Sequence, residues 1–117
     1  MKLLIPRKLL ALAALGGAAA AFAGASSAAV DATAAQALAK KSDCLKCHAV
    51  DKTKKAPSYQ KIAAKWKGKP DAEAKLIDNI TKAPKVKLDD GTEEEHKVVS
   101  SKDAAEIKNL VGWILAQ

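Results

Sequence analysis

Five residues near the middle of the chain guide the interpretation of the whole sequence: Cys44-Leu45-Lys46-Cys47-His48. Two cysteines separated by two residues and followed at once by a histidine form the attachment sequence for a c-type haem. Each thiol adds across one haem vinyl group, and the following histidine is held beneath the iron, which it binds through Nε2. The motif therefore predicts one haem c, attached through Cys44 and Cys47, with His48 as an axial ligand.

Three other uses of this motif stay open. A thioredoxin-like redox pair would need a βαβ context, whereas the flanking segments are helical and polar in character. A structural zinc site could add His96 to the three ligands of the motif, although zinc ligands usually come from two separated pairs. A plain disulfide would leave His48 without a role. Haem attachment uses both thiols and the histidine, so it is the interpretation that we prefer.

Residues 1–29 are predicted to be a secretion signal. Residues 1–8 are basic, residues 9–23 form an apolar run, and small residues follow, with possible cleavage after Ala23 or Ala29. This is the layout of a signal peptide. An uncleaved anchor helix is the alternative, but the run is short for a bilayer and rich in Ala and Gly. We therefore expect export to a bacterial periplasm, with no stable membrane anchor after cleavage.

The remaining length allows one small domain. Removing 29 of the 117 residues leaves 117 − 29 = 88, residues 30–117. A chain this short usually needs a disulfide, a metal or a cofactor to complete its core. With two Cys and two His in all, it is neither a disulfide-dense scaffold nor a multidomain enzyme, and its one Met is Met1. No residue of the expected domain can therefore offer a thioether ligand.

Hydrophobic periodicity predicts an all-α domain of about four helices, without a strand. The helices are expected over residues 31–41, 58–66, 71–80 and 101–117. Asp31 is expected to cap the first helix, and Ser100 or Ser101 the last. The last helix is the clearest, because its apolar residues follow the spacing of one helical face: Ile107, Leu110, Val111, Ile114 and Leu115.

Short motifs follow the haem motif in a recognisable order: AVD at 49–51, APSY at 56–59, IAAKW at 62–66, DAEAKL at 71–76 and LVGWIL at 110–115. Together with the haem motif, they resemble the small bacterial class I cytochromes c over about two-thirds of the sequence. The chain departs from that family at Ala56, where Gly is usual, and in lacking the Met and the Pro-rich run of the distal loop.

The resemblance implies the class I cytochrome c fold around one covalently attached haem, with the first and last helices crossing. In this chain, the crossing would pair Ala34, Ala37 and Leu38 with Leu110, Ile114 and Trp113.

The resemblance also implies haem-binding roles for three residues. The Pro57 carbonyl would accept a hydrogen bond from Nδ1–H of His48, which fixes the tautomer of the ring. Trp66 would point its indole N–H toward a haem propionate, and Tyr59 would contact the haem. Simple core packing is the alternative for Tyr59 and Trp66.

His96 is the candidate for the sixth iron ligand in place of the missing Met. It lies 113 − 96 = 17 residues before Trp113, close to where the Met of the family would fall. Imidazole is a good iron ligand at neutral pH, which favours ligation by both His48 and His96. A solvated His96, with Lys87, Lys97 or nothing at the iron, is the alternative. A nitrogen donor in place of a thioether predicts a lower potential than that of a His/Met relative.

Charge is divided unevenly along the chain, whose total is 20 − 13 = +7. Residues 40–87 hold 14 Lys against 5 acids, a net +9, whereas residues 88–106 hold 7 acids against 2 Lys, a net −5. A haem edge near this junction would lie in a dipolar field that orients a redox partner with an acidic docking surface. Solubility alone is the alternative reason for the lysines. Nucleic-acid binding is not expected, because no recognition motif is present.

These features predict a monomeric, periplasmic carrier of one electron. The sequence contains no acid–base pair, nucleophile–base pair or phosphate loop, so we do not expect an enzyme. Two alternatives remain. One is a haem protein whose open or labile sixth site binds a diatomic gas, and the other is the cytochrome subunit of a larger periplasmic oxidoreductase.

Overall fold

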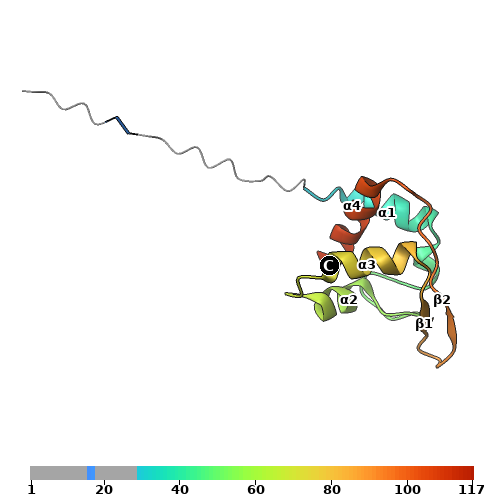
Figure 1. Cartoon of the computed structure of the whole chain (residues 1–117). Helices are drawn as coiled ribbons and strands as arrows, with labels where there is room; N and C mark the ends of the chain where they lie inside the picture. Colours follow the sequence, from blue (N-terminus) through green and yellow to red (C-terminus); the bar gives the residue numbers. More distant parts are fainter. Residues whose placement is uncertain (1–15, 18–28) are drawn as a thin grey trace, which may run out of the picture.

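The computed structural model describes residues 16–17 and 29–117 (Figure 1). The predicted secretion signal lies outside the described residues except at positions 16, 17 and 29. The domain contains α1 (Ala32–Lys41), a short 3-10 helix η1 (Cys44–Lys46), α2 (Tyr59–Trp66), α3 (Ala72–Thr81), β1 (Lys85–Lys87), β2 (Glu93–Glu95) and α4 (Ala104–Leu115). The four predicted helices are thus all present. Within the described ranges, no helix has the length and apolar character needed to cross a membrane.

Side-chain caps mark where three of the helices begin. The Asp31 carboxylate accepts the Ala34 N–H at 2.9 Å, as predicted, and the Ser58 hydroxyl accepts the Lys61 N–H at 3.1 Å. The prediction of a Ser100 or Ser101 cap on α4 is wrong, because Asp103 caps this helix by accepting the Ala105 and Glu106 amides. The Ser101 hydroxyl is engaged elsewhere: it donates to the Glu106 carboxylate at 2.5 Å.

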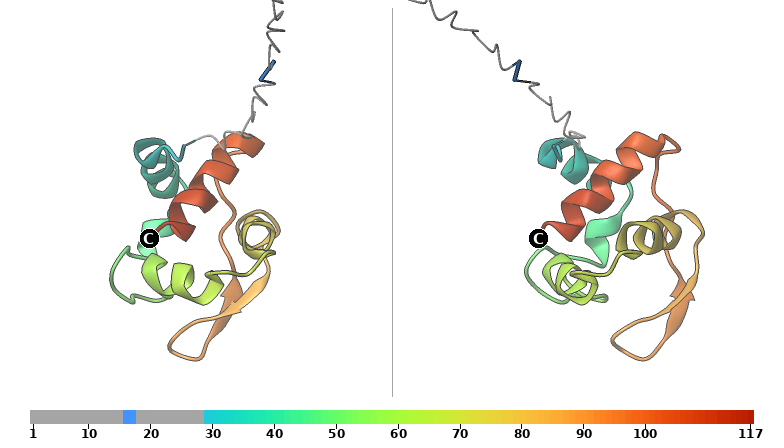
Figure 2. Two further views of the ribbon diagram at one scale, coloured as in Figure 1. Left: turned by 90° about the vertical axis from the view of Figure 1, so that its left-hand side faces the viewer. Right: turned by 60° about the vertical axis from the view of Figure 1, so that its left-hand side comes forward.

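Helix α4 is the centre of the core, since it packs against α1, α2 and α3 (Figure 2). Its predicted apolar stripe is the buried face: Ile107, Leu110, Val111 and Ile114 are all buried, and Leu115 is half-buried. Trp113 is buried as well. The amphipathic pattern therefore identified both the helix and the side that the other three helices cover.

The crossing of α1 and α4 is present, but the predicted contact face of α1 is partly wrong. Ala35 and Ala39 are the buried residues of α1, Leu38 is half-buried against the core, and the predicted Ala34 and Ala37 are exposed. In a helix this rich in Ala, periodicity does not distinguish one face from the next. A long-range contact helps to set the rotation: the Asp31 N–H donates to Asn109 Oδ1 at 2.8 Å, and Asn109 Nδ2 donates to the Asp31 carbonyl at 2.9 Å.

The prediction that the chain has no strand is also wrong, because β1 and β2 form an antiparallel hairpin that projects from the helices (Figure 1). Lys85 lies opposite Glu95 and Lys87 opposite Glu93, so unlike charges face each other across the ladder. The turn uses Gly91 at a φ of 85°, a conformation that favours glycine. Strands of three mostly exposed residues show no alternation of apolar and polar side chains, which is the usual signal for a strand.

Candidate functional site

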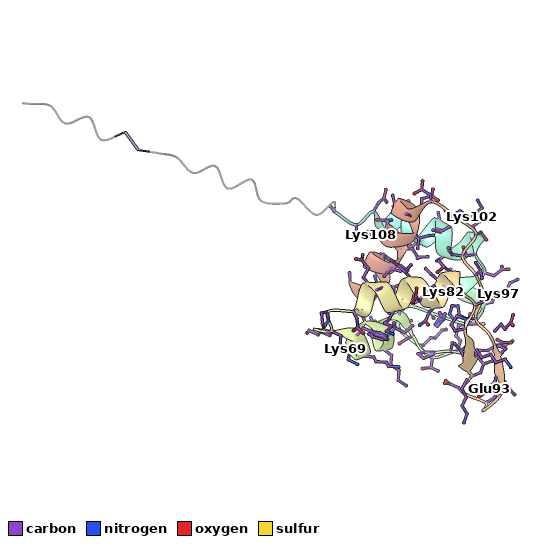
Figure 3. The ribbon with its side chains drawn as sticks, in the orientation of Figure 1. Lys69, Lys82, Glu93, Lys97, Lys102 and Lys108 are labelled. Atoms are coloured by element: carbon purple, nitrogen blue, oxygen red, sulfur yellow. The ribbon has the colours of Figure 1, made fainter. Side chains whose placement is uncertain are left out.

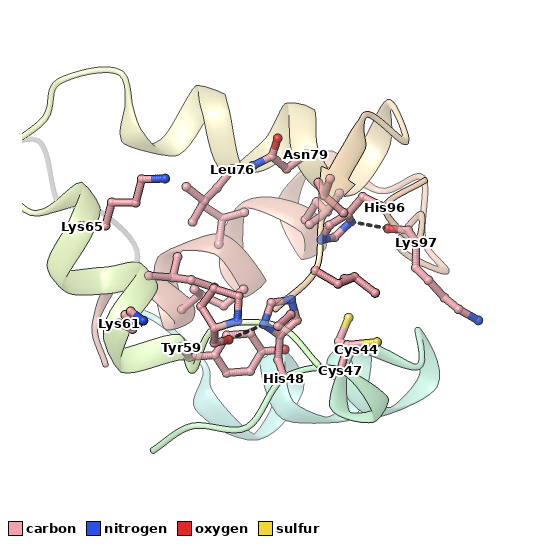
Figure 4. Close-up of a pocket in the computed structure, with 18 of the residues that line it drawn as sticks. Cys44, Cys47, His48, Tyr59, Lys61, Lys65, Leu76, Asn79, His96 and Lys97 are labelled. Carbon is pink, nitrogen blue, oxygen red and sulfur yellow. Dashed lines mark hydrogen bonds between the residues drawn. The ribbon is translucent and has the colours of Figure 1, made fainter. Parts of the chain in front are cut away.

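A mostly apolar cavity of about 550 Å³ lies between η1, α2, α3 and the hairpin, within the size range typical of ligand sites. Every site residue predicted from the sequence borders it: Cys44, Cys47, His48, Pro57, Tyr59, Trp66 and His96. Figure 4 labels the cysteines, the two histidines and Tyr59. Residues from 44 to 96 in the chain are therefore brought to one place. The apolar floor comes from the core side of α3 and α4, including Leu76, Ile80, Leu110, Val111 and Ile114.

The two cysteines both border the cavity, and Figure 4 shows them on the side of the cavity where His48 also lies. Asp43, in the left-handed conformation at a φ of 61°, turns the chain from α1 into η1. The amides of Cys47 and His48 then both donate to the Cys44 carbonyl, at 3.2 and 2.9 Å. This tight turn brings both thiols and the imidazole to the same cavity.

The other uses of the motif find little support here. Cys44 and Cys47 are both free thiols, and partial burial raises the pKa of the Cys44 thiol. Over the part of the chain that the structure describes, no three His, Cys, Asp or Glu side chains are grouped to hold a metal ion. The helices on either side of the motif do not form a βαβ unit. The helical context thus disfavours the thioredoxin-like interpretation.

His48 is held on two sides. Its Nδ1 donates to the Pro57 carbonyl at 2.6 Å, the contact that the resemblance implied. Its ring stacks on Tyr59, with centroids 5.3 Å apart and 19° between the planes. Burial lowers the pKa of His48, which favours the neutral imidazole. The ring therefore keeps Nε2 unprotonated and available to a metal.

His96 enters the cavity from the opposite wall, directly after β2, and its ring faces that of His48 (Figure 4). The two ring centroids are 6.2 Å apart and the planes are tilted by 39°. The His96 N–H donates to the Pro84 carbonyl at 2.9 Å, and its Nδ1 donates to the Lys97 carbonyl at 2.8 Å. Like His48, His96 thus presents Nε2 as its free ring nitrogen.

Tyr59 and Trp66 border the cavity in different ways. Tyr59 is 2% exposed, and its hydroxyl has no hydrogen-bond partner within the described chain. Trp66 is half-buried, with the ammonium groups of Lys65 and Lys69 at 5.8 and 5.1 Å from its ring centre. Both side chains contribute aromatic surface to the cavity. Lys65 and Lys69 place positive charge near the part of the cavity wall that Trp66 forms.

The residues present fit a covalently attached haem. Two free thiols border the same cavity, two imidazole rings lie 6.2 Å apart in it, and most of the wall is apolar. The buried Tyr59 hydroxyl is an orphaned polar atom next to this space, and such groups normally find a partner in the complete protein. A porphyrin, which has a broad apolar face and a polar edge, matches this set of donors and surfaces.

Sequence reasoning missed several polar residues of the cavity wall, among them Lys61, Lys65 and Asn79. A signal for Asn79 was available, because it lies three residues after Leu76 and one before Ile80 on the inner face of α3. Lys61 and Lys65 are one helical turn apart on α2, so they share a face. Nothing in the pattern indicated that this face borders the cavity.

Comparison with known proteins agrees with this geometry. The family model for cytochrome c matches residues 32–117. The class 1 cytochrome MtoD from Sideroxydans lithotrophicus ES-1 is 55% identical, with 75% of this chain and 97% of that chain covered and a TM-score of 0.72. Wild-type cytochrome c552 from Nitrosomonas europaea is 31% identical, with 68% of this chain and 95% of that chain covered and a TM-score of 0.54.

No curated protein gives a significant match to the chain. The family match nevertheless covers the whole helical domain, including the haem motif. The chain therefore belongs to the cytochrome c family, as a class I member with one haem c bound covalently through Cys44 and Cys47.

Proposed function

We propose that this protein is a periplasmic carrier of one electron, with an iron held between His48 and His96, and that it is not an enzyme. The observation that supports this proposal most directly is the pair of imidazole rings that face each other across the cavity beside the two thiols. The bound haem supplies the chemistry, since its iron gains or loses one electron. The side chains of the protein hold, shield and orient that group.

The separation of the two rings supports ligation by both histidines. A metal–imidazole bond is about 2 Å long, and each ring nitrogen lies about 1.1 Å from its ring centre, so a linear pair requires centroids about 6 Å apart. The observed separation is 6.2 Å. Lys87 and Lys97 also border the cavity, but their side chains are exposed. The ring separation therefore favours His96 over the lysine alternatives.

The two histidines also have matching hydrogen bonds. A backbone carbonyl, of Pro57 for one ring and of Lys97 for the other, accepts from each Nδ1. Such a bond fixes the tautomer, orients the ring and raises its basicity as a ligand. Because a nitrogen donor replaces the thioether of His/Met relatives, we expect a lower reduction potential than theirs.

Charges at the cavity rim support docking of a redox partner. Lys61 and Lys65 on α2 border one side, and Glu94 and Glu95 of β2 border another. Residues of both the basic and the acidic part of the chain thus border the cavity, and Glu93 lies toward the far end of the hairpin in Figure 3. We propose that an acidic partner surface approaches over α2, while the acidic hairpin orients it. The haem-binding roles of Pro57, Tyr59 and Trp66 belong to this proposal, with Trp66 directed at a propionate.

Absorption and electron-paramagnetic-resonance spectra of the oxidised protein test the proposal. The wild type is expected to be low-spin without a sulfur-to-iron band in the near infrared. His96→Ala is expected to convert it to a high-spin form, whereas Lys97→Ala, one residue away and exposed, leaves the spectrum unchanged. An unchanged spectrum in His96→Ala overturns the ligation. Rapid and complete binding of carbon monoxide to the reduced wild type would instead support a gas-binding protein.

A further inference from the structure

The segment that carries His96 is held in place by contacts outside the cavity. This distal segment, residues 96–100, connects β2 to α4. The Val99 N–H donates to the Ile80 carbonyl at 2.8 Å, and the Val99 side chain is buried in the core. The Ser100 N–H donates to the Ser42 hydroxyl at 2.9 Å, across 58 residues of sequence. The end of the segment that follows His96 is therefore anchored to the helices.

Ser42 and Asp43 lie directly before Cys44 and face this segment. Ser42 is 4% exposed and ends α1, with its own N–H donating to the Leu38 carbonyl at 2.9 Å. The Asp43 carboxylate contacts Lys97 Nζ at 3.6 Å, one residue after His96, and Lys46 Nζ at 3.1 Å. Two adjacent residues thus connect α1, the haem-attachment turn and the distal segment.

We propose that Ser42 and Asp43 are positioning residues for the sixth iron ligand. They connect the covalent attachment point of the haem to the segment that carries His96, so the two sides of the site move together. This inference rests on the proposed ligation by His96. Its physical basis is that any displacement of residues 96–100 that carries His96 away from the cavity breaks the part-buried Ser42–Ser100 hydrogen bond and the Asp43–Lys97 contact.

The rate at which an added ligand displaces His96 tests this role. Carbon monoxide is mixed with the reduced protein, and imidazole with the oxidised protein, and both rates are followed by absorbance. Loss of this part-buried hydrogen bond in Ser42→Ala is expected to raise these rates about five- to tenfold. Asp43→Asn breaks an exposed pair, so a rise of about two- to fivefold is expected, which high salt reduces. Asn tolerates the left-handed conformation at position 43, so the turn itself is preserved.

Two control variants remove the same kinds of contact elsewhere. Asn109→Ala breaks the two hydrogen bonds that tie the other end of α1 to α4. Asp78→Asn removes an exposed carboxylate that pairs with Lys82 at 2.9 Å. Neither residue borders the cavity, and the side-chain hydrogen bonds and ion pair described for them lead to Asp31 and Lys82 rather than to residues 96–100. Both controls are expected to displace His96 at the wild-type rate, even if Asn109→Ala unfolds more easily.

The outcomes separate this inference from the proposed ligation. Equal displacement rates in Ser42→Ala and Asn109→Ala, with a high-spin His96→Ala, overturn the positioning role alone. An unchanged oxidised spectrum in His96→Ala overturns both. If Ser42→Ala does not give a folded haem protein, the comparison of Asp43→Asn with Asp78→Asn decides, because both positions are exposed at the surface. Faster displacement of His96 in Asp43→Asn than in Asp78→Asn supports the inference. Equal displacement rates in these two variants overturn it.

Discussion

The imidazole of His48 stacks on the phenol ring of Tyr59, with ring centroids 5.3 Å apart. Tyr59 in turn meets Trp113 edge to face, at 5.4 Å between centroids. Three aromatic rings therefore connect the haem-attachment motif to α4 in the centre of the core. The same side chain therefore contacts the His48 ring on one side and the core of the domain on the other.

Removing the ring of Tyr59 is expected to destabilise the protein much more than removing its hydroxyl. Tyr59→Leu loses both aromatic contacts and leaves a void, and we expect it to lower the free energy of unfolding by about 2–4 kcal/mol. Tyr59→Phe keeps the ring, so a change within about 1 kcal/mol is expected. Guanidinium unfolding, followed by haem absorbance and circular dichroism, gives both values. An equal decrease in the free energy of unfolding in the two variants would show that the aromatic contacts of Tyr59 do not stabilise the domain.

Replacing His96 by Met is expected to restore a His/Met haem. The reduction potential rises, because a thioether stabilises the ferrous iron more than a nitrogen donor does. A weak near-infrared band appears in the oxidised protein, and redox titration measures the change in potential. Lys97→Met is the matched control, because it introduces the same thioether one residue away at an exposed position. A near-infrared band in the control, or a fall in the potential of His96→Met, would contradict the assignment.

Charge reversal at the rim is expected to slow reactions with anionic redox reagents. Lys61 and Lys65 border the cavity, whereas Lys102 and Lys108 lie toward the opposite end of the domain from the hairpin (Figure 3). At low salt, Lys61→Glu combined with Lys65→Glu lowers the rate of oxidation by ferricyanide roughly threefold to tenfold. Lys102→Glu combined with Lys108→Glu changes the net charge equally and has a smaller effect. Stopped-flow measurements at several salt concentrations check both, since high salt removes the difference. Equal slowing by the two pairs would mean that only net charge matters.

The start of α4 is expected to depend on Asp103 rather than on Ser101. Asp103→Ala leaves the amides of Ala105 and Glu106 without their acceptor, which costs about 1 kcal/mol of stability. Ser101→Ala removes a hydroxyl from an exposed contact and costs less. Thermal unfolding of the two variants compares them directly. A larger loss of stability in Ser101→Ala than in Asp103→Ala would support the serine cap expected from the sequence.

Much of the fold could be predicted because its signals are local. The apolar stripe of α4 and the Asp31 cap are both visible as residue patterns over a few turns. The face of α1 was not predictable in this way, because alanine side chains on either side are equivalent and the contact with Asn109 spans 78 residues. The hairpin was missed because its strands are short and charged, although Asp90-Gly91 is a known turn signal.

In the candidate site, too, local sequence patterns could be predicted and long-range contacts could not. The haem motif is a contiguous pattern with a specific chemistry, so five residues were enough to indicate the cofactor. Three polar residues border the cavity because of how α2 and α3 pack: Asn79, Lys61 and Lys65. The spacing of residues along the sequence does not predict how two helices pack against each other. The bond between Ser42 and Ser100 likewise joins two serines whose separation in sequence carries no signal.

The hydrogen bonds from Nδ1 of His48 and His96 to backbone carbonyls also bear on the rate of electron transfer. Because the carbonyls of the main chain accept from each Nδ1, either imidazole must give up this hydrogen bond to rotate. We therefore expect little nuclear rearrangement between the two oxidation states, a small reorganisation energy and rapid self-exchange between molecules in solution.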